Sequence, residues 1–375
     1  MSHRSRWIGT SARTPATVLA RLIVAVSMVA LLGGACATDR EGDAANRSGD
    51  DSSVATERTD PADQRDAAPP TPTTDLDCPQ PPVGTGRKDD APFAVGRSTD
   101  QFVDPSRPTG APDAPGSSTD RVLPVAVLYP AQGPPGAAGS VVDGATPADG
   151  RFPLVVYAHG VGSSGAERHD ALARWVRAGY VVVAPTFPLS SRGLDISDLP
   201  SQPGDLAFVV ESVRDRVQDP SDMLHDHVRS DCLALAGHSL GGATALAAAF
   251  DPCCTSIGTD AVIDIAGVAV LVTPGATLGA AAPLPTLIVH GSLDATVPAA
   301  QSDRAFAELP GRRWLLTFPG GGHNSMFDPP ELDVLTASVV GFLDAQLKGV
   351  PDAMARASSV IVDFGGLATL REAPA

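Results

Sequence analysis

The sequence has few aromatic and few basic residues, and both shortages limit what the chain can bind. Aromatic side chains make up 5% of its 375 residues, which disfavours a sugar-binding platform built from stacked rings. Asp and Glu outnumber Lys and Arg by 43 to 27, which gives a formal net charge of −16. Such a surface repels phosphate groups. We therefore expect no nucleic acid as a partner and no simple electrostatic docking on anionic lipid.

Cysteine is also scarce, with five residues at positions 36, 78, 232, 253 and 254. No C-x-x-C spacing suggests a zinc site, and we expect no metal and no cofactor. If Cys36 is lipidated or removed, the other four can pair in three ways, which the sequence leaves open. Cys232, at the head of a predicted strand, is predicted to be a buried thiol. A bridge from Cys78 to Cys253 or Cys254 would tie the N-terminal segment to the domain.

The N-terminus has the order of a secretory signal. Four arginines and no acid precede an apolar run at 22–32, which ends in the small residues 33–37. We therefore interpret residues 1–37 as a secretory or lipoprotein signal. Two alternatives stay open: Cys36 is lipidated and anchors the protein to the envelope, or Ala35-Cys36-Ala37 is an ordinary cleavage site. Either way, we expect an exported protein that is extracellular or tethered to the cell envelope.

Two further segments follow the signal. Residues 38–90 are acidic, rich in Pro and Thr, and poor in large apolar side chains. Such a segment cannot bury enough surface to offset its conformational entropy, so we predict a disordered tether. Residues 91–375 have the size of a single α/β domain, and we expect a monomer.

Within the domain, short apolar runs alternate with segments of helical periodicity. Strands are predicted near 121–130, 153–158, 180–184, 233–236, 261–272, 285–290 and 313–318, and helices near 166–178, 205–217, 299–309 and 331–347. This alternation predicts a mainly parallel central sheet with helices on both faces. The irregular segment 185–204 is a candidate for the substrate rim, and Asp205 is a candidate helix cap. Residues 350–375 show no clear pattern.

The most informative stretch is residues 232–247, CLALAGHSLGGATALA. A bare G-x-S-x-G is a weak pattern in a chain with 37 glycines. Here, however, it joins an apolar run to a helical segment, which is the context of a nucleophile elbow. Ser239 must then adopt a strained turn, and Gly237 and Gly241 must leave room for it. We predict that Ser239 is a nucleophile.

A serine nucleophile needs a base and an acid that orients the base. His323 lies in a glycine-rich loop directly after the last strong strand, and we predict that it is the base. Asp294, in the turn after the 285–290 strand, is the favoured acid. Asp264, in Val262-Ile263-Asp264-Ile265, is the alternative, because a carboxylate among apolar residues needs a partner.

The oxyanion of the tetrahedral intermediate needs two backbone N–H donors. Leu240, directly after the nucleophile, and Val161, in the glycine-rich loop after the 153–158 strand, are the predicted donors. His225 and His227 could suggest a metal, but residues two apart share a face only in a strand. With no third ligand nearby, we interpret them as loop residues.

These motifs together resemble the α/β-hydrolase superfamily over residues 120–348. The resemblance rests on LPVAVLYPA, PLVVYAHGVGSS, YVVVAP, GHSLGG, TLIVHGSLDATVP and GGGHNS. Within it the chain is similar to dienelactone-hydrolase-like esterases, cutinase-like polyester hydrolases and platelet-activating-factor acetylhydrolases. Dienelactone hydrolases carry a cysteine nucleophile, where this chain has Ser239. The acetylhydrolases take their acid from the position that Asp264 resembles, and the polyester hydrolases from that of Asp294.

The sequence therefore predicts a serine esterase with a Ser239-His323-Asp294 triad and an acyl-enzyme intermediate. Its substrate would be a small-molecule, lipid or polyester ester, and the sequence does not fix the acyl length. Two alternatives are an envelope acyltransferase that uses the same triad and a non-catalytic binding protein of this fold.

Overall fold

The computed structural model describes Cys78 and residues 92–110, 117–136 and 140–374. The predicted signal at 1–37, which includes Cys36, lies outside these residues. So does the predicted tether at 38–90, apart from Cys78. In the described part, no helix has the length and apolar character that a bilayer span requires.

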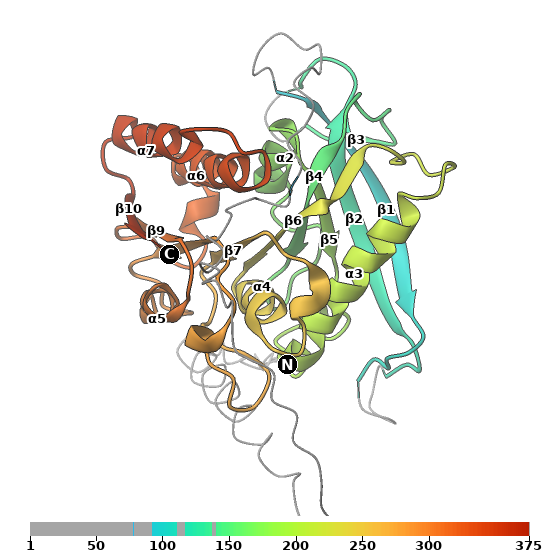
Figure 1. Ribbon diagram of the computed structural model, residues 1–375, viewed down its shortest axis with the longest axis horizontal. Coiled ribbons are helices and arrows are strands. Elements are labelled where there is room, and N and C mark those ends of the chain that lie inside the picture. The colour runs from blue at the N-terminus through green and yellow to red at the C-terminus, as the bar shows by residue number, and fades with distance from the viewer. Residues whose placement is uncertain (1–77, 79–91, 111–116, 137–139, 375) are drawn as a thin grey trace, which may run out of the picture.

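One sheet of ten strands forms the centre of the molecule (Figure 1). The strands are β1 (Ala94–Asp104), β2 (Arg121–Ala131), β3 (Val142–Asp143), β4 (Phe152–Ala158), β5 (Val181–Pro185), β6 (Val228–His238), β7 (Ala261–Ile265), β8 (Thr286–Gly291), β9 (Arg313–Phe318) and β10 (Thr369–Ala373). Their order across the sheet is β10-β9-β8-β7-β6-β4-β5-β2-β1-β3. The six central strands from β5 to β9 are parallel, whereas β2 and β10 pair antiparallel with β5 and β9. The predicted, mainly parallel sheet is thus observed.

Helices cover both faces of this sheet, as the sequence predicts. They are α2 (His169–Arg177), α3 (Gln202–Arg216), α4 (Leu240–Phe250), α5 (Ala300–Glu308), α6 (Glu331–Leu347) and α7 (Ala353–Asp363). One core contains buried residues of α2, α6 and α7, and the other contains those of α3, α4 and α5 (Figure 1). Short 3-10 turns at Ser190–Arg192, Leu199–Ser201, Thr255–Ile257, Leu278–Ala280 and Ser325–Phe327 lie in the connections.

Strand β4 shows how alternation builds the two cores. All seven of its residues are buried. Val155 and Tyr157 belong to the core under α2 and α6, while Leu154 and Val156 belong to the opposite core. Successive side chains of a strand point to opposite faces, so a continuous apolar run is what a sheet covered on both sides requires.

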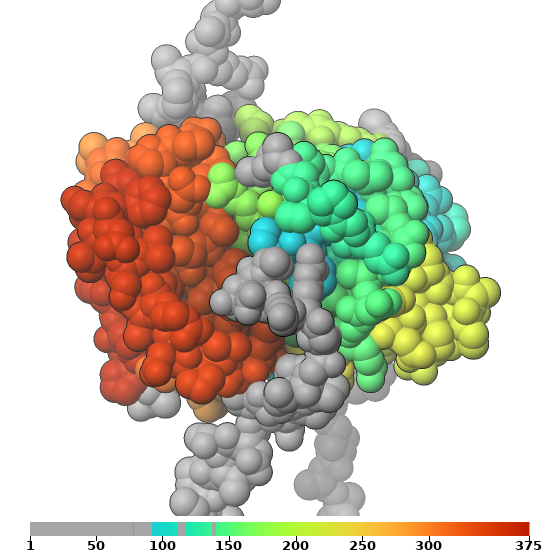
Figure 2. All heavy atoms as spheres, turned by 90° about the horizontal axis from the view of Figure 1, so that it is seen from above, coloured from blue at the N-terminus to red at the C-terminus, as the bar shows by residue number. Residues whose placement is uncertain are grey.

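Both ends of the sheet hold elements that the sequence did not reveal. Strand β1 pairs with β2 along its full length, although its mixed composition gives no clear strand pattern. At the other end, residues 350–374 contain α7, which packs on α6, and the edge strand β10. Figure 2 shows these C-terminal residues, in red, on one side of the molecule and residues near 120–150, in green, on the other.

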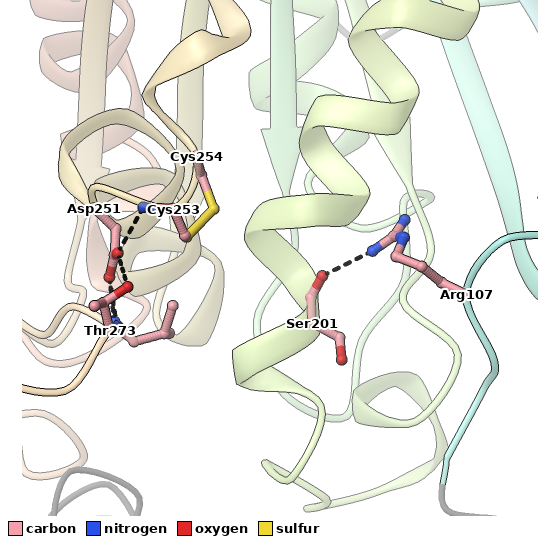
Figure 3. The surroundings of a disulfide bond; sticks show 7 residues. Arg107, Ser201, Asp251, Cys253, Cys254 and Thr273 are labelled. Atoms are coloured by element: carbon pink, nitrogen blue, oxygen red, sulfur yellow. Dashed lines mark hydrogen bonds between the residues drawn. A yellow bond between two sulfur atoms is a disulfide. The ribbon is translucent and has the colours of Figure 1, made fainter. Parts of the chain in front are cut away.

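The cysteine pairing corrects two predictions. Cys232 is joined to Cys78 and is therefore not a free buried thiol. Cys253 and Cys254, which are adjacent in sequence, pair with each other (Figure 3), so neither bridges to Cys78. Cys232 stands at the head of the buried run of β6, where the fold brings it 5.2 Å from Cys78 between Cα atoms. Sequence spacing carries no information on this approach.

Candidate active site

The candidate nucleophile lies on the turn between β6 and α4. Ser239 has φ 58° and ψ −120°, a region that non-glycine residues rarely adopt. Its backbone N–H donates to the carbonyl oxygen of Ile265 at 2.8 Å, which links the turn to the end of β7. The strained conformation is thus held by the neighbouring strand.

The two glycines of the pentapeptide have a steric role in this turn. A Cβ atom at Gly237 would lie 2.1 Å from the carbonyl oxygen of Gly241, and one at Gly241 would lie 2.0 Å from that of Ala158. Both distances are far below van der Waals contact. Any side chain at either position would force β6, α4 and β4 apart and move Ser239.

His323 and Asp294 come together at the carboxyl edge of the sheet. The two atoms His323 Nδ1 and Asp294 Oδ2 are 2.6 Å apart. Asp294 Oδ1 accepts from the backbone N–H groups of Thr296 and Val297 at 2.7 and 2.9 Å. Burial of Asp294 opposes its ionisation, but the hydrogen bonds from His290 and His323 outweigh it and hold its pKa below the ordinary value. An ionised carboxylate only accepts, so Nδ1 of His323 carries the proton and Nε2 is free to take one.

Asp264, the alternative acid, is in a different environment. It is fully buried, and neither carboxylate oxygen has a hydrogen-bond partner in the described part of the chain. Its Oδ1 lies against Gly242 and Gly267, where a Cβ atom would approach it to 2.3 and 2.1 Å. Burial raises the pKa of Asp264 to about 6. The fold therefore brings Asp294, and not Asp264, to His323.

His238, the residue before Ser239, places the histidine loop beside the elbow. Its ring centroid is 4.8 Å from that of His323, and its Nε2 is 3.1 Å from the His323 carbonyl oxygen. Phe327 packs edge-on against the other side at 5.1 Å. Burial, followed by the neighbouring His323, holds the pKa of His238 well below its ordinary value, so the ring is neutral and donates through Nε2. In sequence, His238 is only the variable position of G-x-S-x-G, which gives no signal of this role.

His290, at the end of β8, also contacts the Asp294 carboxylate. Its Nε2 lies 3.2 Å from Asp294 Oδ2 and 2.9 Å from the Val297 carbonyl oxygen, while its Nδ1 is 2.5 Å from Ser302 Oγ. Two acceptors at Nε2 place the proton there. His290 is therefore a second donor to the carboxylate that contacts His323.

The predicted oxyanion donors come from two segments that meet at Ser239. Leu240 is the first residue of α4. The loop after β4 reaches the elbow at Gly160, where a Cβ atom would lie 3.3 Å from Ser239 Cβ. Within the described residues the Val161 N–H has no hydrogen-bond partner. A loop N–H without a partner beside the serine is what an oxyanion site needs.

Comparisons with known proteins agree with this architecture. The chlorophyllase family model matches residues 125–278, which is less than half of the chain. The ferulic acid esterase from Streptomyces cinnamoneus is similar in structure, with a TM-score of 0.54, 24% sequence identity, and coverage of 74% of this chain and 96% of that one. The chain has an α/β-hydrolase fold. None of the curated proteins matches the sequence.

Within this fold, an apolar cluster borders the elbow. Its buried members are Leu199, Leu240 and Ala243, and partly buried side chains pack against them: Val161, Ile196, Val268, Val270 and Val272. Both predicted oxyanion donors belong to this cluster. A substrate group bound next to the reacting carbon would therefore meet an aliphatic surface.

The two histidines considered for a metal have other partners. His225 Nδ1 lies 2.8 Å from the Val217 carbonyl oxygen, and His227 Nδ1 lies 3.2 Å from that of Gly150. The described residues contain no group of three His, Cys, Asp or Glu side chains arranged to hold a metal ion.

Proposed function

We propose that this chain is a carboxylic ester hydrolase in which Ser239, His323 and Asp294 form the catalytic triad. The observation that carries the proposal is the 2.6 Å contact between His323 Nδ1 and Asp294 Oδ2, together with the contact of His323 with His238, the residue before Ser239 in its positive-φ turn. The α/β-hydrolase fold, the chlorophyllase family match and the structural likeness to a ferulic acid esterase support it.

The reaction follows from the protonation states of these groups. Ser239 Oγ attacks the ester carbonyl carbon while His323 Nε2 takes its proton, and Asp294 stabilises the imidazolium that forms. The backbone N–H groups of Leu240 and Val161 donate hydrogen bonds to the carbonyl oxygen and stabilise the negative charge that develops on it. His323 then returns the proton to the leaving alcohol. A water molecule then attacks the carbonyl carbon of the acyl enzyme in the same way, with His323 as the base, and releases the carboxylic acid and free Ser239.

The apolar cluster bordering the elbow supports an ester whose group next to the carbonyl is apolar. We propose that the protein works outside the cytoplasm, anchored through Cys36 or freely secreted. The two disulfides of the domain support this, because such bonds persist in oxidising compartments.

Hydrolysis of short p-nitrophenyl esters by the purified protein tests the proposal. Ser239→Ala is expected to lose nearly all activity, and Asp294→Asn is expected to lower kcat by about 10⁴, because it removes the acceptor that fixes the His323 tautomer. Asp264→Asn is the matched control and is expected to keep kcat within about tenfold of wild type. Wild-type rates in the Ser239→Ala protein would refute the proposal. Product analysis with an added alcohol would identify an acyltransferase instead.

A further inference from the structure

Segment 186–202 connects the two sides of the proposed oxyanion site. Three of its groups bind the loop after β4. The backbone N–H of Phe187 donates to His159 Nε2 at 3.0 Å, the Ser190 carbonyl oxygen accepts from the Gly162 N–H at 2.6 Å, and Thr186 Oγ1 accepts from the Gly165 N–H at 2.9 Å. The position of the Val161 N–H thus depends on this segment.

The same segment reaches the other donor through Gln202. Gln202 is fully buried, and its Nε2 donates to Ser190 Oγ at 2.8 Å. Its Oε1 lies 2.6 Å from Thr244 Oγ1, which is itself 2.9 Å from the Leu240 carbonyl oxygen. The single Thr244 hydroxyl proton is shared between these two acceptors, so a chain of polar contacts runs from Gly162 through Ser190, Gln202 and Thr244 to Leu240.

A buried ion-pair cluster of Arg121 with Asp198 and Asp205 holds segment 186–202 in place. Asp198 Oδ2 accepts from the Leu189 N–H at 3.2 Å, and Oδ1 accepts from Arg121 Nη2 at 2.7 Å. Arg121 also contacts Asp205 through two hydrogen bonds of 2.5 and 2.6 Å. The side chains of all three residues are at most 1% exposed. Charged groups this deeply buried are costly to separate. The ion pair therefore holds Asp198 in place, and Asp198 in turn holds the backbone at residues 189 and 190.

We propose that Gln202 is a positioning residue that sets the spacing between the Val161 and Leu240 N–H groups. It does not touch the substrate and acts through Ser190 and Thr244. The inference rests on the proposed ester hydrolysis. A misplacement of about 1 Å at a reacting group can cost about 10²-fold in rate, so the chain is expected to affect kcat more than substrate binding.

The test compares kcat and KM of the full chain carrying Gln202→Leu, Ser190→Ala, Thr244→Val or the last two together. Gln202→Leu is expected to lower kcat between about 10- and 100-fold with KM changed by less than about threefold. Affinity for a phosphonate transition-state analogue is expected to fall in parallel. Ser190→Ala and Thr244→Val are expected to be non-additive in kcat, because either one interrupts the same chain.

Thr286→Val is the matched control. Thr286 is as buried as Thr244, and its hydroxyl likewise donates to a backbone carbonyl, that of Leu284 at 3.1 Å, but it lies at the start of β8. It is expected to lower the thermal midpoint as much as Thr244→Val and to leave kcat unchanged.

Wild-type kcat in folded Gln202→Leu protein would overturn the inference, as would equal kcat losses in Thr244→Val and Thr286→Val. If Gln202→Leu does not fold, the Ser190 and Thr244 variants decide. Failure of the proposed function is distinguishable, because it requires an active Ser239→Ala protein, whereas failure of this inference alone leaves Ser239→Ala inactive.

Discussion

At the scale of single residues, two aspartates with similar sequence contexts have opposite environments. Both follow apolar runs in the second half of the chain. Asp294 has two backbone donors and two histidines around it. The carboxylate of Asp264 is buried without a hydrogen-bond partner in the described part of the chain, and burial raises its pKa to about 6. The first is therefore charged at neutral pH, and the second changes its charge near pH 6.

This difference predicts a contribution of Asp264 to the pH dependence of stability, which the Asp264→Asn variant isolates. Its folded-state pKa lies above the unfolded value, so its contribution to stability is fully present below about pH 4 and is lost as pH rises through about 6. The loss amounts to about 3 kcal/mol, from about two pKa units. Asp264→Asn, which stays neutral, is expected to melt higher than wild type at pH 8 and to approach wild type at pH 4. Thermal unfolding of both proteins between pH 4 and 8 measures this. Parallel curves would contradict it.

At the scale of elements, the packing of α7 on α6 depends on a glycine inside a helix. A Cβ atom at Gly341 would lie 2.7 Å from Ala357 Cβ and 3.0 Å from the Ala353 carbonyl oxygen. The helices can approach this closely only because position 341 lacks a side chain. The helical pattern of 331–347 was readable in the sequence, but the need for glycine was not, since the partner helix lies in a region without a clear pattern.

Gly341→Ala is expected to destabilise the protein. In an exposed helix, Ala in place of Gly would stabilise by about 1 kcal/mol. Here the added methyl group overpacks the contact between α6 and α7, which costs about 1 to 3 kcal/mol, so the net effect on the free energy of unfolding is a loss. Urea unfolding of Gly341→Ala measures the effect, and the double variant with Ala357→Gly is expected to recover part of the loss. A more stable Gly341→Ala protein would show that α7 does not pack as described.

Segment 185–204 is an element whose role the sequence predicts only in outline. The sequence predicts an irregular substrate rim there, and Ile196 and Leu199 border the elbow. The segment also contains two 3-10 turns, and α3 starts within it at Gln202. Asp205 does not cap this helix, because its carboxylate binds Arg121 across 84 positions of sequence.

At the scale of the whole molecule, two disulfides differ in how much chain they constrain. Cys78 and Cys232 are separated by 154 positions, and their bond ties Cys78 to β6 in the centre of the sheet. Cys253 and Cys254 are neighbours. The turn that holds them is fixed by Asp251, which accepts from the backbone N–H groups of Val272 and Thr273 at 2.6 and 2.8 Å (Figure 3).

Cys78→Ser is expected to lower the free energy of unfolding by about 4 kcal/mol, because a long closed loop removes much entropy from the unfolded chain. Cys254→Ser is the matched control. The Cys253–Cys254 bond that it removes closes almost no loop, so this variant is expected to lose far less free energy of unfolding. Urea unfolding of the two variants without reductant compares them. Equal losses would contradict the assignment of the Cys78–Cys232 bond as the constraint that matters.

The sequence by itself determined the alternation of strands and helices, the elbow around Ser239 and the candidate base His323. These depend on local patterns: apolar runs, helical spacing and glycines where a turn has no room. Only the tertiary structure decided that Asp294 and not Asp264 meets His323, that Cys232 pairs with Cys78, and that Gln202 links both sides of the elbow. Those contacts join loops far apart in the chain, and their meeting depends on strand order, which no single stretch of residues encodes.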